Sequence, residues 1–161
     1  MKITTLLPFA AVALVATPAT AQVMTPAEYV ATAGASDLYE RQSSQMVLES
    51  TQDPKVRAFA TMMLRDHAKS TADIKAAAAR SRVRAAPPKL NPTQTEKIAE
   101  LRAATGPARD QAYVAQQRAS HNQALDVHKA YSTEGTAPAL RTVATAIVPV
   151  VTHHVEMLKT M

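Results

Sequence analysis

One apolar stripe between Val56 and Ala77 constrains the fold of this chain most strongly. Its residues recur at alternating steps of four and three, which is the period of one face of an α-helix: Val56, Ala60, Met63, His67, Ser70, Ile74 and Ala77. His67 therefore lies on the apolar face of a long helix. Because an imidazole is costly in an apolar interior unless something binds it, we expect other polar groups to meet it there.

The composition supports a helical protein. Hydrophobic residues make up 47% of the 161 residues, but alanine supplies many of them, aromatic residues are only 4%, and there are three glycines. Such a chain is typical of closely packed helices and is poor in the residues that favour strands. The length is that of a single domain.

The first 21 residues have the pattern of a secretory signal peptide. Lys2 is followed by an apolar run, Ile3 to Ala16, and by the small residues Ala19-Thr20-Ala21. We expect cleavage after Ala21, which leaves one domain at residues 22–161 with a net charge of 17 − 13 = +4. The chain has no cysteine, so it has neither a lipid-modified cysteine nor a disulfide. We expect an exported protein, periplasmic or extracellular, with association with the outer membrane as an alternative.

Prolines after capping residues mark the starts of the helices. Thr25-Pro26 begins a helix to about Ser50, Asp53-Pro54 begins one to about Arg82, and Asn91-Pro92 begins a short segment that ends before Gly106. Thr93 and Glu96 offer an alternative cap for that segment. A further helix runs from Gly106-Pro107 to about Thr133, and the last begins near Pro138 and contains Pro149, which should kink it. Short connections make consecutive helices antiparallel.

Each of the other long helices has its own stripe. The stripe of the first helix is polar in its middle and consists of Val30, Ala33, Asp37, Glu40, Ser44 and Val47. A rotated face with Leu38, Met46 and Leu48 is the alternative. The third long helix has two histidines on its stripe: Val114, Arg118, His121, Leu125, His128 and Ser132. The last helix has a mainly apolar stripe: Leu140, Ala144, Ile147, Val151, His154 and Leu158.

The helical rise places polar groups of these stripes at comparable heights. Glu40 lies roughly 12 residues before the first turn and His67 roughly 14 after it, so their heights differ by about 3 Å at about 1.5 Å per residue. His121 lies roughly 12 residues before the last turn and His154 roughly 17 after it, a mismatch of about 7 Å. The prediction is a well-matched Glu40–His67 pair and a less well-matched His121–His154 pair.

Several motifs together resemble a known family: Ala35–Glu40, Asp53–Ala60, Met63–His67, Tyr113, His121–Leu125, Pro138–Leu140, Pro149 and His154. With them the chain resembles, over roughly residues 25–160, the exported bacterial ferritin-like domain of unknown function 4142, which is often labelled "predicted outer membrane protein". The resemblance implies an all-α, ferritin-like antiparallel four-helix bundle, with a short extra helical segment before the third long helix. It implies an exported location and no settled activity.

The ligands of a ferritin-like di-iron site are incomplete here. Such a site needs a Glu from each of two helices and Glu-x-x-His from each of the other two. Leu64 and Val151 occupy the carboxylate positions of those motifs, and only Glu40 keeps its type. What remains is a candidate mononuclear site that suits zinc, copper or iron: Glu40, His67, His121 and His154.

A hydrogen-bonded polar core is the alternative interpretation of these residues, with the histidines paired to Glu40, Asp37 or Tyr113. Met63 and Met157 could supply thioethers to copper, or simply fill gaps in the core. The remaining groups are expected elsewhere: His153 at the surface, and Asp66 in solvent or paired with Lys69 or Ser70.

The segment from Arg80 to Lys89 is basic and contains no acidic residue. It predicts a weak contact with an anionic membrane surface through Arg80, Arg82, Arg84 and Lys89. No aromatic residue lies among these cations, so we expect no binding of nucleic acid. A solvated basic loop is the alternative.

Catalytic signals are otherwise lacking, since the chain has no phosphate-binding loop, no cysteine and no serine in an elbow motif. This favours a protein that is not an enzyme. The first functional hypothesis is an exported helical module in envelope stress or surface association, with a buried His/Glu cluster. The second is a mononuclear metal-binding or metal-dependent redox protein that uses this cluster.

Overall fold

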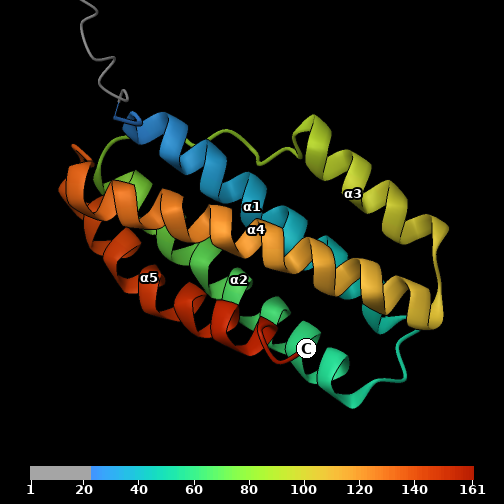
Figure 1. Ribbon diagram of the computed structural model, residues 1–161. Helices are drawn as coiled ribbons and strands as arrows, with labels where there is room; N and C mark the ends of the chain where they lie inside the picture. Colours follow the sequence, from blue (N-terminus) through green and yellow to red (C-terminus); the bar gives the residue numbers. More distant parts are fainter. Residues whose placement is uncertain (1–22) are drawn as a thin grey trace, which may run out of the picture.

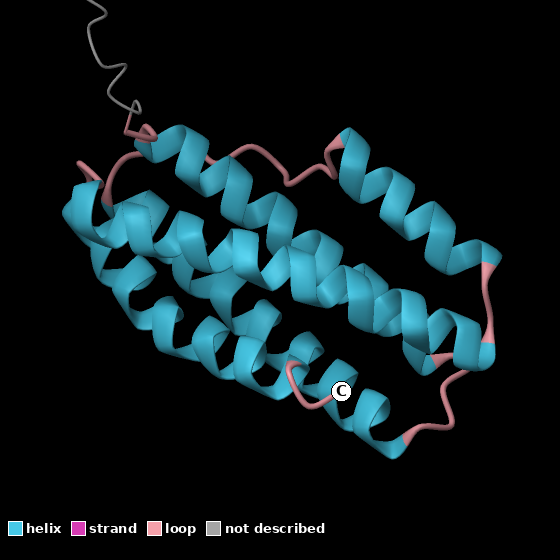
Figure 2. Ribbon diagram, viewed as in Figure 1, coloured by secondary structure: helices cyan, strands magenta, loops and turns pink. Residues whose placement is uncertain are grey.

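The computed structural model describes residues 23–161, so the predicted signal peptide lies outside the described residues. Residues 23–161 form five α-helices and no strand (Figures 1 and 2). The helices are α1 (Pro26–Leu48), α2 (Pro54–Arg80), α3 (Pro92–Ala103), α4 (Gly106–Glu134) and α5 (Pro138–Leu158). The predicted all-α class is confirmed, and the predicted ends at Ser50 and Arg82 are two residues too late.

The helix starts follow the capping pattern of the sequence. The Thr25 hydroxyl of α1 accepts the Glu28 N–H at 3.3 Å, while the Glu28 carboxylate accepts the Thr25 N–H at 2.8 Å. At the start of α2 the Asp53 carboxylate accepts the backbone N–H groups of Lys55 and Val56. The start of α3 is capped by Asn91 and Gln94, and not by the alternative pair Thr93 and Glu96. These caps satisfy backbone donors that have no partner within the helix.

Four long helices pack side by side, and the short helix α3 packs on the outside of α1 and α4 (Figure 1). In the ring α1–α2–α5–α4 each long helix contacts two neighbours. The short loops at 49–53 and 135–137 reverse the chain, so α1 and α2 run antiparallel, as do α4 and α5. The connection from α2 to α4 crosses the length of the molecule and includes α3, which contacts α1 and α4.

The core consists of two apolar clusters with a polar layer between them along the helices. One cluster includes Tyr29, Ile74 and Leu140, and the other includes Phe59 and Leu158. Between them in each helix come buried polar residues: Asp37, Glu40, Ser43 and Ser44 in α1, His67 in α2, Gln117 and His121 in α4, and His154 in α5. The fold therefore holds the carboxylates of Asp37 and Glu40 and the three imidazoles of this layer in the interior, with apolar packing on both sides.

Most of the predicted stripes are confirmed. Every residue of the predicted α1 and α5 stripes is buried, and so is the α2 stripe except for Ser70, which is partly buried. In α5 the helix continues through Pro149. The α1 stripe with its polar middle, and not the rotated apolar face, points into the core.

The predicted stripe of α4 is wrong over much of its length. Arg118 is exposed and Val114, Leu125 and Ser132 are only partly buried, although His121 and His128 are buried as predicted. The face that points inward is set by large side chains that are mostly polar: Arg109, Tyr113, Gln116, Gln117, His121, His128 and Tyr131. Hydrogen bonds such as Tyr113 to Ser44 at 2.8 Å make this burial favourable, and an apolar pattern does not detect them.

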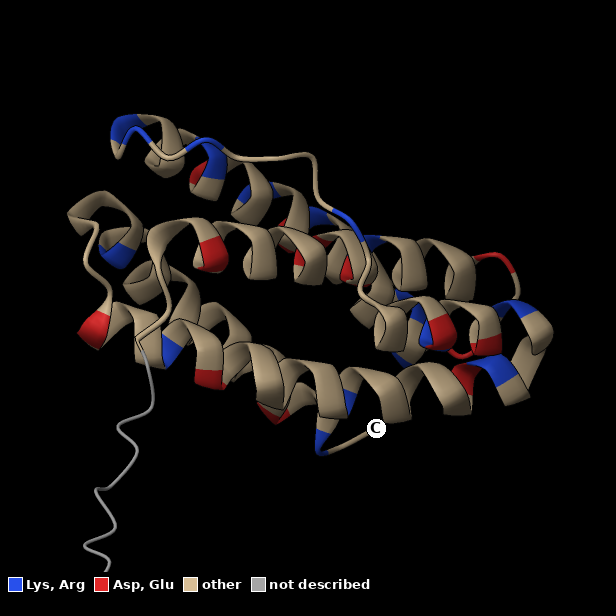
Figure 3. Cartoon of the chain, turned by 90° about the horizontal axis from the view of Figure 1, so that it is seen from above, with Lys and Arg blue, Asp and Glu red and all other residues tan. Residues whose placement is uncertain are grey.

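The basic residues of the α2–α3 connection lie at the surface (Figure 3). Arg80, Arg82, Arg84 and Lys89 are all exposed. No helix in the described part of the chain has both the length and the apolar character needed to cross a membrane. Contact of this segment with an anionic membrane surface stays a prediction.

Leu140→Ala is expected to lower the free energy of unfolding by about 2–5 kcal/mol, because it removes buried methyl groups and leaves a cavity. Leu140 is fully buried, whereas Val150 on the same helix is 41% exposed. Val150→Ala therefore serves as a control with a change within about 0.5 kcal/mol. Urea unfolding measures both, and equal losses would contradict the assignment of the α5 core face.

Candidate metal centre

Three histidines from three helices converge in the polar layer. One ring nitrogen of each of His67 (α2), His121 (α4) and His154 (α5) lies within 4.8 Å of the other two. Their ring centroids are 5.3–5.9 Å apart. The 7 Å mismatch expected between His121 and His154 does not keep them apart, since this pair has the shortest separation, 5.3 Å.

Each of these imidazoles has one nitrogen held by a hydrogen-bond acceptor. The Nδ1–H of His67 donates to Asp37 at 2.8 Å, and the Nδ1–H of His121 donates to the backbone carbonyl of Gln117 at 3.0 Å. The Nε2–H of His154 donates to Asp66 at 3.0 Å. Because an ionised carboxylate or a carbonyl can only accept, these bonds fix which nitrogen carries the hydrogen.

The other nitrogen of each ring has no hydrogen-bond partner. These atoms are Nε2 of His67, Nε2 of His121 and Nδ1 of His154, and all three are buried. Buried polar atoms are normally hydrogen-bonded, so three unpaired nitrogens in one cluster are unusual. When neutral, each of these nitrogens has a lone pair available to a ligand.

Burial keeps two of the three imidazoles neutral at pH 7. Burial, together with the neighbouring His67 and His154, lowers the pKa of His121 to about 3. Burial also lowers the pKa of His154 to about 4, although its bond to Asp66 acts in the opposite direction. For His67 burial acts the same way, but the hydrogen bond to Asp37 and nearby carboxylates outweigh it and raise the pKa.

Glu40 lies beside the three histidines but is not part of the converging group. Its Oε1 is 3.8 Å from Nδ1 of His121, and its Oε2 is buried without a partner. Burial raises the pKa of Glu40 to about 7, with the charge of His67 acting against this. The structure therefore brings three of the four predicted ligands together and places the fourth next to one of them.

Asp37 and Asp66 hold two of the histidines in place. Asp37 accepts from His67 through Oδ1 and from the Thr71 hydroxyl through Oδ2 at 2.9 Å. The expectation that Asp66 faces solvent or pairs with Lys69 or Ser70 is wrong, because Asp66 bridges Arg65 and His154. Asp66 lies one residue before His67, on the side of α2 that meets α5, and that contact was not visible in the periodicity.

The remaining histidines lie outside the cluster. His128 is buried, and its Nδ1 is 3.0 Å from the hydroxyl of Tyr29. His153 is exposed, as predicted. Met63 is fully buried in the apolar cluster that contains Phe59, which agrees with a core-filling side chain.

A cavity of about 170 Å³ borders the three-histidine cluster. His67 and His154 both line it, together with Asp37 and Asp66. Residues of all four long helices line this cavity, and the exposed residues Lys69 and Val150 are among them, so it opens to the surface.

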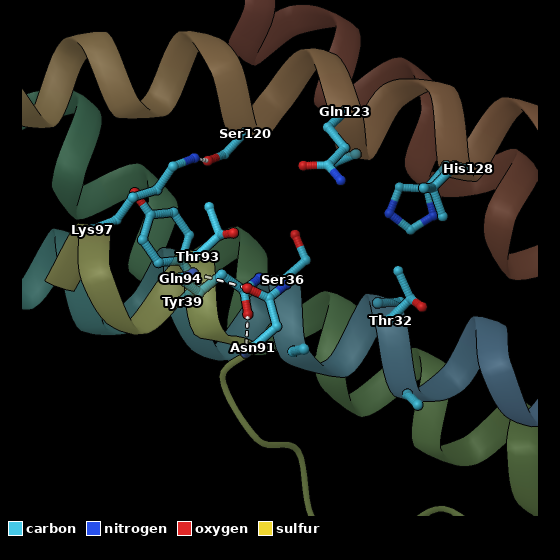
Figure 4. A pocket seen from close by; sticks show the side chains of 15 residues that line it. Thr32, Ser36, Tyr39, Asn91, Thr93, Gln94, Lys97, Ser120, Gln123 and His128 are labelled. Carbon is cyan, nitrogen blue, oxygen red and sulfur yellow. Dashed lines mark hydrogen bonds between the residues drawn. The ribbon is translucent and has the colours of Figure 1, made fainter.

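A larger cavity of about 410 Å³ lies between α1, α3 and α4 (Figure 4). Lys97 crosses it, donates to Ser120 at 3.0 Å and lies 5.5 Å from the centre of the Tyr39 ring. Hydroxyl and amide side chains make up most of its polar lining, with His128 at its far end (Figure 4). It contains one imidazole and no carboxylate, so its lining does not offer a group of metal ligands.

A family model matches residues 11–161, nearly the whole chain, and its description is "Domain of unknown function (DUF4142)". The chain belongs to the DUF4142 family. The resemblance found in the sequence is thereby confirmed. No curated protein matches this member of the DUF4142 family.

One solved structure shares the fold of this DUF4142 chain. It is described as "Crystal structure of putative secreted protein DUF305 from Streptomyces coelicolor", and it matches with a TM-score of 0.64 and 13% sequence identity. The match covers 85% of this chain and 90% of that one. At this identity the likeness shows the fold alone.

The free energy of unfolding of the metal-free protein is expected to fall as the pH falls from about 6.5 to about 4.5. In this window His121, His128 and His154 stay neutral in the fold, with pKa values of about 3, about 4 and about 4, whereas the unfolded chain binds a proton at each. Glu40, with a pKa of about 7, and His67, whose pKa is raised, act in the opposite direction, but they are two groups against three.

Urea unfolding curves in the presence of a chelator measure this dependence. The loss is expected to be smaller in His121→Asn, which removes one of the buried imidazoles, and unchanged in His153→Asn, which alters an exposed one. Equal unfolding free energies at pH 4.5 and 6.5 would contradict the neutral state of the buried histidines.

Proposed function

We propose that the protein binds one late first-row transition metal ion through Nε2 of His67, Nε2 of His121 and Nδ1 of His154. The observation that carries this proposal is the set of three buried ring nitrogens without hydrogen-bond partners in one cluster. A cation bound there would accept all three lone pairs. Each of the three buried nitrogens would then have a partner, and the fourth position of a tetrahedral ion would stay open.

The hydrogen bonds of the opposite ring nitrogens support this proposal. Histidines that bind metals usually donate their other N–H to a carboxylate or a backbone carbonyl, which orients the ring and makes the ligand more basic. His67, His121 and His154 each do so, to Asp37, Gln117 and Asp66 respectively. A polar core without a metal has no need for the second nitrogen of every ring to stay unpaired.

The donor set favours zinc or copper, with iron as a further candidate. Imidazole suits all three, and neutral nitrogen ligands need no bridging carboxylate. In a tetrahedral zinc site with Zn–N bonds of about 2.0–2.1 Å the nitrogens lie about 3.4 Å apart. The cluster, with nitrogens within 4.8 Å, would contract slightly on binding.

A di-iron centre is a poor fit. The positions three residues before His67 and His154 are Leu64 and Val151, which supply no carboxylate, and Val151 is buried. We nevertheless propose a ferritin-like arrangement for the chain. It is supported by two antiparallel helix pairs joined by one long crossover, which contains α3.

We also propose that the protein acts outside the cytoplasm, in the periplasm or beyond it. The signal-peptide pattern of residues 1–21 supports this, and the solved structural relative is described as secreted. Metal handling in that compartment would fit a chain without cysteine, because imidazole ligands are not subject to thiol oxidation.

Isothermal titration of the metal-free mature protein with Zn²⁺ is expected to show one tight site per chain. His67→Ala, His121→Ala and His154→Ala should each weaken binding by at least tenfold, because each removes one of three ligands. His153→Ala is the matched control, since it removes an exposed imidazole from the same helix, and it should bind as the wild type does.

Circular dichroism of each variant separates loss of the site from loss of the fold. If folded wild-type protein takes up no metal at micromolar concentrations of Zn²⁺, Co²⁺ or Cu⁺, the proposal fails. The polar layer would then be a hydrogen-bonded core in an exported helical module.

Asp66→Ala is expected to weaken metal binding by about 10–100-fold without removing a ligand, because His154 loses the acceptor that orients its ring. Asp73→Ala is the control, since Asp73 pairs with Lys69 at the surface and with none of the three histidines. The same titration measures both variants. Equal affinities for Asp66→Ala and the wild type would contradict the role of Asp66.

A further inference from the structure

The three-histidine cluster leaves one coordination position without a protein ligand. Glu40 is not among the converging groups, and its Oε1 lies beside Nδ1 of His121, the nitrogen that faces the backbone of Gln117. A tetrahedral ion held by three imidazoles keeps its fourth position open, which is the arrangement found in sites that bind an external molecule. What can reach that position depends on the cavity that borders the cluster.

The cavity of about 170 Å³ has a wall of small apolar side chains. Ile147, Val150 and Val151 of α5 form this wall, with Ala124 of α4 and Ala146 of α5 beside them. Val150 is 41% exposed and lies at the outer side, whereas Ile147 and Val151 are buried. An apolar cavity of about 150 Å³ is large enough to take a small uncharged molecule.

The charged groups of the same cavity disfavour anions. Its lining contains the carboxylates of Asp37, Asp66 and Asp73 but only one cation, Lys69. Lys69 is already paired with Asp73 at 2.6 Å. The side chains of this lining therefore offer an anion no unpaired cation.

Ser70 provides a hydrogen-bond donor without a partner in this cavity. Its hydroxyl is buried, makes no hydrogen bond and belongs to a residue that lines the cavity one helical turn from His67. A buried hydroxyl without a partner is costly. A molecule bound between Ser70 and the histidines would satisfy it.

We propose that this cavity admits a neutral diatomic molecule, of the class of dioxygen, nitric oxide and carbon monoxide, to the open position of a Cu⁺ or Fe²⁺ ion at the three histidines. The Ser70 hydroxyl donates a hydrogen bond to the bound molecule. This inference rests on the proposed metal binding and adds to it the class of external ligand. The apolar wall, the acidic lining and the free donor of Ser70 favour such a molecule over an anion.

Infrared spectroscopy of the Cu⁺-loaded protein under carbon monoxide tests the inference, because bound carbon monoxide gives a distinct stretching band. The wild type is expected to show one band. Val150→Trp should lose most of it, because the indole fills the cavity, while Cu⁺ affinity in a chelator competition stays the same. Val23→Trp is the matched control, since Val23 is similarly exposed at 40% and does not line the cavity.

Ser70→Ala should keep the band but shift its frequency, because the hydrogen bond to the bound molecule is lost. Ser120→Ala, in the other cavity, should leave the frequency unchanged.

A protein that binds Cu⁺ tightly but gives no band would overturn this inference and leave the metal site standing. An unchanged band in Val150→Trp would overturn the route through the cavity, and an unchanged frequency in Ser70→Ala would overturn the role of the hydroxyl. Failure to bind Cu⁺ or any other metal would overturn the proposed function itself.

Discussion

The hydrogen bond from His67 to Asp37 is the contact on which the polar layer depends. It joins α1 to α2 in the interior at 2.8 Å, with both side chains almost fully buried. The second oxygen of Asp37 is satisfied by Thr71, so the carboxylate has partners on both sides. Turning the His67 ring away would leave Asp37 buried with one hydrogen bond fewer, which is costly. The contact therefore holds the ring in one orientation. The rings of His121 and His154 then complete the cluster from α4 and α5, between two apolar clusters that exclude water.

Much of the fold could be predicted from local patterns, because capping residues and apolar periodicity are local. The caps at Thr25 and Asp53 and the inward faces of α1 and α5 are where the sequence indicates. The face of α4 was predicted poorly for a physical reason. Its buried residues include Gln116 and Gln117, whose burial depends on partners in other helices, such as Tyr39 and Ser43. Such partners are not visible in the sequence of one helix.

The sequence predicted which three histidines lie close together, but not the place of Glu40. Histidines on apolar stripes identified His67, His121 and His154, and counting along the helices ranked Glu40 as the best-matched partner of His67. In the structure the three rings meet, and Glu40 lies to the side of His121. Height along a helix says nothing of the direction of a side chain around it. Asp66 was missed for the same reason, since its reach toward α5 depends on how α2 and α5 pack. The solved structural relative shares the fold at 13% identity, so the chemistry is argued from these side chains alone.

The most direct test of metal binding by the three histidines is anomalous diffraction from crystals of the zinc-loaded protein, recorded on both sides of the zinc absorption edge. The account predicts one buried peak, about 2.0–2.1 Å from Nε2 of His67, Nε2 of His121 and Nδ1 of His154. Asp37, Asp66 and the Gln117 carbonyl should keep their hydrogen bonds to the opposite nitrogens. A peak only at the exposed His153 or at other surface residues, with the buried cluster empty, would contradict it.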